Sequence, residues 1–198
     1  MGYNFQSFST LYSDITGFVT LIRSIYESSE RSTTQKLIHE LKSDKDLVSV
    51  HINQNNGKQI FKHDYTRVID HELATAKKIT DVNYDVIFAP KGMFGRGQKR
   101  FDIFAIKNDS SIIKADLKAN FEPTPNAIFK LIESGNKQAE HLVIDVNSTI
   151  SSDDLIDGLR SGLSAGKNVK TIMLFYKKKF HNLDRNAIFS KNIYKMLK

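Results

Sequence analysis

Short apolar runs that alternate with helical segments constrain the fold of this 198-residue chain more than any other feature. Five runs of strand length lie between residues 84 and 176: Tyr84–Ala89, Phe101–Ile106, Ile112–Ala119, Leu142–Val146 and Val169–Tyr176. Polar or turn-forming residues bound them, which predicts strands. Helical patterns precede the first run and separate the last three. We therefore expect an α+β domain with a four- to five-stranded sheet, antiparallel or mixed, flanked by helices.

The N-terminal part of the chain has a helical pattern of its own. Apolar residues recur at intervals of three and four from Phe8 to Tyr26, which is the spacing of one helical face. Two short strands follow, Leu47–Ile52 and Gln59–Lys62, and the Asn-Gly turn between them predicts a hairpin. We expect residues 1–64 to form a helical lobe with this hairpin, and residues 65–198 to form the α+β domain.

Several kinds of site are excluded by composition and motif. The chain has no cysteine, so disulfides, thiolate zinc sites and cysteine nucleophiles are ruled out. None of the six histidines has the H-E-x-x-H spacing, and no G-x-S-x-G motif is present. A histidine-dependent ribonuclease using His71, His141 or His181 stays an open alternative, because imidazole titrates near neutral pH.

Two observations bear on location. No apolar run reaches the roughly 20 residues that a membrane span needs, so we expect no membrane-spanning segment. The N-terminus lacks the basic and apolar regions of a signal peptide, so no secretory leader is expected.

The charge of the chain is unevenly distributed. Residues 1–65 hold seven Lys/Arg and seven Asp/Glu, whereas the remainder holds the other 22 and 15 and therefore the whole net charge of +7. A basic module favours a polyanionic partner, most often nucleic acid, although solubility alone also accounts for such a balance. Part of this charge lies in the Gly-rich segment 91–100. We expect Lys91, Arg96, Lys99 and Arg100 to contact a nucleic-acid backbone, with a merely flexible loop as the alternative.

The first motif with chemical content combines Asp102 with Asp116 and Lys118. Asp116 and Lys118 are two residues apart on one predicted strand and therefore share a face. Two carboxylates beside an ammonium can hold a divalent cation and steer water to a phosphate, and Glu72 on the preceding helix can add a third oxygen. The alternative is a set of exposed charges on a half-buried strand.

This arrangement, within a helix, three strands, helix, strand order, resembles the core of PD-(D/E)XK nucleases, with Phe101 where the family has proline. The resemblance implies a metal-dependent DNA endonuclease in which Glu72, Asp102 and Asp116 hold Mg²⁺ or another divalent cation.

A longer series of segments covers roughly residues 68–180. In order, they are Lys99-Arg100-Phe101-Asp102, Ala115-Asp116-Leu117-Lys118, residues 124–128 (TPNAI), and Lys137-Gln138-Ala139 leading into the strand at 142–146. This series resembles the C-terminal toxin nucleases of contact-dependent growth inhibition (CdiA-type tRNases) and related phage-borne domains, in the barnase/EndoU/colicin/RelE-like group.

The second resemblance implies a toxin ribonuclease that cleaves tRNA through a basic cleft. It places Asp102, Asp116, Lys118, Thr124 and Gln138 in the catalytic site, and it implies no cofactor, because the RNA 2′-hydroxyl is the nucleophile. It also implies delivery from another cell or a phage, action in the cytoplasm and an acidic immunity protein. We take the ribonuclease as the leading hypothesis, the metal-dependent endonuclease as the second, and a non-catalytic nucleic-acid-binding module as the third.

Overall fold

The computed structural model describes residues 38–39, 43–90, 100–107 and 111–198. The strands are β1 (Leu47–Ile52), β2 (Gln59–His63), β3 (Tyr84–Phe88), β4 (Ile103–Lys107), β5 (Ser111–Asn120), β6 (His141–Val146), β7 (Thr171–Tyr176) and β8 (Lys179–Asp184). The helices described are α3 (Asp70–Asp81), α4 (Pro125–Asn136), α5 (Ser152–Ala165), α6 (Arg185–Phe189) and α7 (Ile193–Met196). Within this part of the chain, no helix is long and apolar enough to cross a membrane.

All the strands in the described residues belong to one mixed sheet of eight strands in sequence order, so the expectation of four or five strands is wrong. Strands β3, β4 and β5 are antiparallel neighbours, and β5, β6 and β7 are parallel. Two additions make up the difference. The N-terminal hairpin joins the sheet, because β2 pairs in parallel with β3, and β8 pairs with β7 at the other edge.

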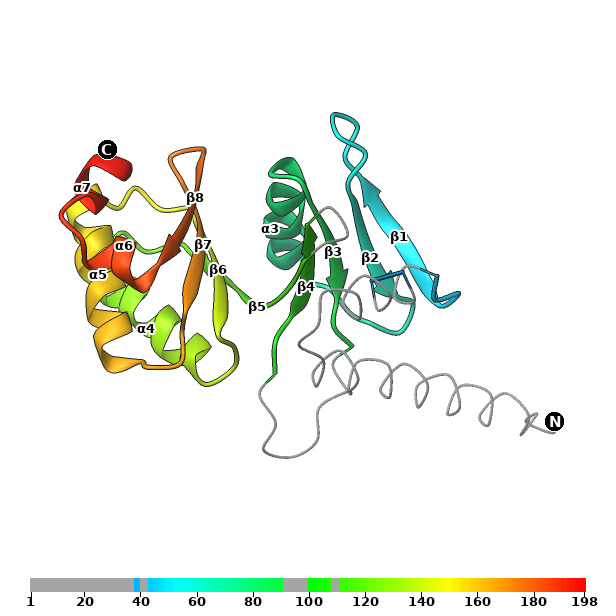
Figure 1. The fold of residues 1–198 in the computed structure, drawn as a ribbon, viewed down its shortest axis with the longest axis horizontal. Coiled ribbons are helices and arrows are strands. Elements are labelled where there is room, and N and C mark those ends of the chain that lie inside the picture. Colours follow the sequence, from blue (N-terminus) through cyan, green and yellow to red (C-terminus); the bar gives the residue numbers. More distant parts are fainter. Residues whose placement is uncertain (1–37, 40–42, 91–99, 108–110) are drawn as a thin grey trace.

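Helices cover both faces of the sheet, and side-chain alternation along the strands explains how (Figure 1). On β6, Leu142 and Ile144 pack in the core beneath α4 and α5, whereas Val143 between them belongs to the core beneath α3. Strand β7 repeats this division between its even-numbered and odd-numbered residues. Strands buried on both faces are apolar throughout, which is why these two runs stand out in the sequence.

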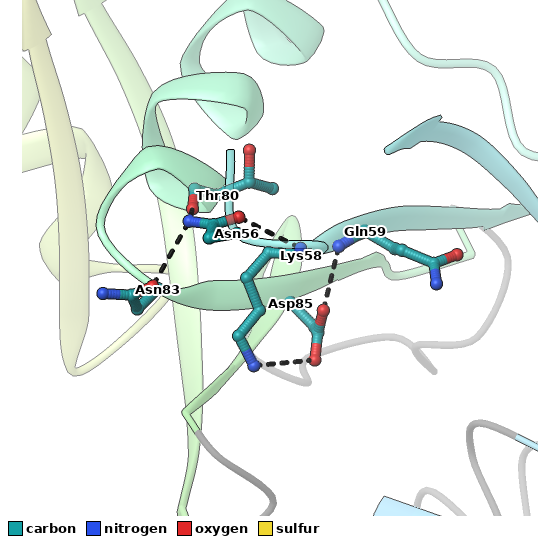
Figure 2. Close-up of polar contacts among 6 residues, drawn as sticks. All are labelled: Asn56, Lys58, Gln59, Thr80, Asn83 and Asp85. Carbon is teal, nitrogen blue, oxygen red and sulfur yellow. Dashed lines mark hydrogen bonds and ion pairs between the residues drawn. The ribbon is translucent and has the colours of Figure 1, made fainter. Parts of the chain in front are cut away.

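Polar contacts fasten the N-terminal hairpin to the rest of the sheet (Figure 2). Asn56 in the turn donates to the Thr80 carbonyl at 2.8 Å, at the end of α3. The buried Asp85 carboxylate on β3 accepts the Gln59 amide at 2.9 Å and lies 3.4 Å from Lys58 Nζ. Asp85 thus satisfies a backbone amide at the start of β2 and Asn56 satisfies a carbonyl at the end of α3, so the hairpin is held in line with β3.

Candidate functional site

The site lies where β5 leaves β4 and continues beside β6. The β4–β5 ladder ends with the pair Ile103–Ala115, and from Asp116 onward β5 pairs with β6 alone. Beyond this pair, the Asp102 carboxylate replaces a backbone carbonyl of β4 as the hydrogen-bond acceptor for β5, because its Oδ2 accepts the Leu117 amide at 2.8 Å. The divergence of the two strands therefore brings Asp102 beside Asp116.

Asp116 is fully buried and has three polar neighbours. Lys118 Nζ lies 2.7 Å from its Oδ2, and the lysine side chain itself is 16% exposed. The Gln138 amide faces the same carboxyl group and, with its nitrogen turned inward, donates at 2.5 Å to Oδ1 and 3.3 Å to Oδ2. Asp102 supplies the third contact, a hydrogen bond between the two carboxyl groups. The structure thus brings together Asp102, Asp116, Lys118 and Gln138.

The acidity of Asp116 follows from these surroundings. Burial raises the pKa of Asp116 to about 7, and the hydrogen bond and charge of Asp102 act in the same direction. The Lys118 ammonium opposes that change by favouring the ionised form. Near neutral pH this carboxyl group can therefore bind or release a proton.

A cavity of about 230 Å³ opens beside Asp102 at the edge formed by the end of β3 and the start of α3. Glu72, Arg100 and Gln138 also line it. Glu72 Oε2 accepts the Ile69 amide at 3.2 Å as part of the N-terminal cap of α3, so this side chain is held at the cavity by the helix start.

A second cavity of about 280 Å³ adjoins the first, since Phe101 and Gln138 line both. It also contains Lys114 and His141. Burial lowers the pKa of Lys114 to about 8, although the nearby Glu140 charge favours its protonated form. Lys114 was not among the residues predicted from the sequence, and neither were Thr66 and Arg67, which line the first cavity. The alternation that links Asp116 to Lys118 extends back to Lys114 and could have identified it.

Thr124 does not belong to this site, contrary to expectation. Its hydroxyl accepts the Ala127 amide at 3.2 Å and caps the N-terminus of α4, whereas Gln138 follows the C-terminus of the same helix. A helix of this length separates the two by about 18 Å. Of the basic residues predicted to bind nucleic acid, Arg100 lines the first cavity, and Lys91, Arg96 and Lys99 lie outside the described residues.

The histidines considered for catalysis lie in three different places. His141 lines the second cavity, where its Nδ1 is 2.7 Å from the Thr171 hydroxyl, and burial lowers its pKa. His71 is on the exposed side of α3, and His181 is on β8, where burial lowers its pKa. The candidate site is therefore centred on carboxyl groups and a lysine.

The donor atoms near Asp116 fit a hard divalent cation. Within the described residues, no three His, Asp or Glu side chains come close enough to enclose a metal by themselves. Mg²⁺, however, is commonly held by one or two carboxylates together with water and substrate phosphates. Asp102 and Asp116 supply such a pair, and a cation between them would oppose both the burial and the Asp102 charge that raise the Asp116 pKa.

Comparisons with protein-family models, with curated proteins and with solved structures find no match to this chain.

Proposed function

We propose that this protein is a metal-dependent nuclease that hydrolyses phosphodiester bonds at the Asp102–Asp116 pair. The observation that carries the proposal is the position of Asp116, buried between a second carboxylate and the Lys118 ammonium at the point where two strands diverge. The helix, three strands, helix, strand order of the PD-(D/E)XK resemblance recurs as α3, β3–β5, α4 and β6.

Each residue has a role that its surroundings support. Asp102 and Asp116 would hold the cation, which, when bound, lowers the pKa of a water molecule and offsets charge on the phosphate. Lys118 places a positive charge 2.7 Å from Asp116, where it can orient the attacking water or stabilise the charged transition state. Gln138 fixes the orientation of the Asp116 carboxylate by donating to it.

A metal-free ribonuclease is the second candidate, and the raised pKa of Asp116 favours it. A group that titrates near pH 7 is suited to general acid–base catalysis, so Asp116 could take the proton of an RNA 2′-hydroxyl. Lys118 would then stabilise the phosphate directly. Toxin activity, a tRNA substrate and an acidic immunity protein belong to this candidate.

A cleavage assay separates the two candidates. Purified protein is incubated with plasmid, single-stranded DNA and total tRNA, each with Mg²⁺ and with EDTA. We expect cleavage with Mg²⁺ and none with EDTA. Asp116→Asn and Lys118→Ala should each lower the rate by about 100- to 1,000-fold, because the first removes a proposed ligand of the cation and the second removes a preorganised positive charge. Lys195→Gln, on α7, is the charge-matched control and should cleave at the wild-type rate.

The other outcomes are equally specific. Cleavage of tRNA that continues in EDTA and depends on Asp116 would replace the first candidate with the second. A folded protein that binds these nucleic acids and cuts none of them would reject both in favour of the non-catalytic binding module.

A further inference from the structure

A larger cavity lies at the other end of β6 from the proposed nuclease site. Asp116 pairs with Leu142 near the start of β6, whereas Val146 at the end of that strand lines this cavity of about 800 Å³. Figure 1 shows α3 on one side of β6 and the β7–β8 hairpin on the other, and residues of these elements form its walls. We call it the carboxyl-edge cavity, because the parallel strands β6 and β7 end there. Ligands of open α/β sheets commonly bind at this edge, and the volume is typical of small-molecule sites.

One wall of the carboxyl-edge cavity is aromatic. Phe175 on β7 and Phe180 on β8 are cross-strand partners with ring centroids 5.3 Å apart, and Val82 lines the cavity from the end of α3. Phe180 is only half-buried, so part of its surface is available to a ligand. Aromatic side chains stack on planar rings, including nucleobases. This wall therefore fits a planar aromatic group.

Two lysines form the turn at the rim of the cavity. Tyr176 pairs with Lys179, so the two central residues of the β7–β8 turn are Lys177 and Lys178, with φ angles of 49° and 61°. Two-residue turns of this kind favour Asn-Gly, because other side chains are strained at positive φ. Both lysines are exposed and line the cavity. Strained residues cluster at functional sites, so two strained lysines beside a cavity indicate a role for their charge.

The charges around the cavity favour an anion at this turn. Asp145 is buried and pairs with Lys78 at 2.6 Å, so these two charges offset each other. The other carboxylate that lines the cavity belongs to Asp81 at the end of α3, across β6 from the turn. Lys177 donates to the Ser152 hydroxyl at 3.1 Å, which leaves two of its ammonium protons for a ligand. Positive charge without a carboxylate partner is therefore concentrated at the turn.

We infer that the carboxyl-edge cavity binds a free mononucleotide, with its base against Phe180 and its phosphate at Lys177 and Lys178. The aromatic wall supplies stacking, and the two ammonium groups offset the charge of the phosphate. Asp116 faces Gly135 of α4, whereas Phe175 belongs to the core beneath α3, so the two sites lie on different faces of the sheet. The inference goes beyond the proposed nuclease function and stands without it.

The first test replaces the turn by the sequence that its backbone favours. The full chain is titrated in EDTA with adenosine 5′-monophosphate (AMP) and with adenosine, and binding is followed by calorimetry. The double variant Lys177→Asn, Lys178→Gly should bind AMP about 10-fold more weakly and adenosine within about twofold of wild type, because only AMP carries the phosphate. Its melting temperature should rise by about 2–4 °C, because Asn-Gly relieves the strain. A purely structural turn would gain stability without losing AMP affinity.

The second test addresses the aromatic wall and supplies matched controls. Phe180→Leu should weaken AMP and adenosine alike, by about fivefold or more, because both ligands carry the base. Phe189→Leu changes an exposed phenylalanine on α6 and should leave both affinities unchanged. Lys130→Gln combined with Lys167→Gln removes two exposed charges that do not line the cavity, and should bind AMP within about twofold of wild type.

Four outcomes would overturn the inference. The first is a wild-type protein that does not bind AMP, and the second is unchanged AMP affinity in the double turn variant. The third is AMP binding that is lost in Lys118→Ala and kept in the turn variant, which would place the nucleotide at the nuclease site. The fourth is a single-stranded oligonucleotide that binds at the turn while AMP does not, which would assign the cavity to a polynucleotide. The turn variant should cleave nucleic acid at the wild-type rate, so failure of either proposal leaves the other standing.

Discussion

Asp116 shows how a buried acidic residue can be held ready for chemistry. Its carboxyl group has no exposed surface, yet it has a donor in Gln138, a cation in Lys118 and a second carboxyl group in Asp102. Neither full ionisation nor full protonation satisfies all three neighbours. The protein therefore carries an electrostatic cost at this residue that a bound cation or substrate would change, which is a common property of functional sites.

The pH dependence of stability should expose this cost. Because the Asp116 pKa is raised above its unfolded value, the folded state retains a proton that the unfolded state releases. The resulting stabilisation is complete below about pH 4, and it is lost as the pH rises through about 7. The free energy of unfolding is measured with urea in EDTA at pH 5 and at pH 8. Between these two pH values it should fall by at least about 1 kcal/mol more for the wild-type protein than for Asp116→Asn.

His63, His141 and His181 change stability in the opposite direction, because burial lowers their pKa values and acid therefore destabilises the fold. The wild-type protein and Asp116→Asn both contain these histidines, so the effect of the histidines on stability cancels when the two proteins are compared. Identical pH profiles for the two proteins would show that Asp116 is ionised throughout this range.

At the scale of the helices, two glycines set how closely α5 approaches α4. A Cβ atom at Gly158 would lie 2.6 Å from the Pro125 carbonyl oxygen, and one at Gly162 would lie 2.7 Å from Ile132 Cβ. The two glycines are four residues apart and share one face of α5. Their contact fixes the position of α4, whose C-terminal end leads to Gln138 beside Asp116.

Gly162→Ala should therefore destabilise the protein. Alanine favours a helix by about 1 kcal/mol over glycine, but overpacking a tight interface costs about 1–3 kcal/mol. The Ile132 Cβ atom, 2.7 Å from the added methyl group, is bonded directly to the backbone and therefore cannot move away without shifting the helix. We expect a net loss of about 1–2 kcal/mol in urea unfolding. Ser161→Ala, an exposed neighbour on the same helix, should be neutral or slightly stabilising. A Gly162→Ala protein as stable as wild type would mean that the helices can move apart.

At the scale of the whole molecule, the positive charge should govern nucleic-acid affinity. The net charge of +7 belongs to the C-terminal two-thirds of the chain, where Arg67, Arg100 and Lys114 line the two cavities. Binding through phosphates releases counterions, so log affinity falls linearly with log salt concentration.

A triple variant tests the basic segment predicted from the sequence. Arg96→Ala, Lys99→Ala and Arg100→Ala together should weaken duplex binding for unrelated sequences and lower the salt slope by up to about 2.7. The measurement is anisotropy of a labelled duplex between 50 and 200 mM salt. An unchanged slope would mean that these three side chains do not contact the backbone.

Much of the local structure could be predicted from the sequence. The predicted strands at Leu47–Ile52 and Tyr84–Ala89 match β1 and β3 to within one residue. Strand β8 was missed because its turn contains Lys177 and Lys178 at positive φ, where Asn or Gly is the usual signal.

The sequence by itself determined strands β1 to β7 and helices α3, α4 and α5, and that Asp116 and Lys118 share a face, because side-chain alternation and helical periodicity depend on neighbours in the chain. Only the tertiary structure decided that β2 pairs with β3, that β5 exchanges β4 for β6 at Asp116, and that Gln138 joins the site while Thr124 does not. Those outcomes depend on contacts between segments far apart in the chain, such as the Asp85 carboxylate that holds β2 and the glycines that position α4. Periodicity specifies which face a residue occupies, whereas the partner it meets there is set by packing of the whole sheet.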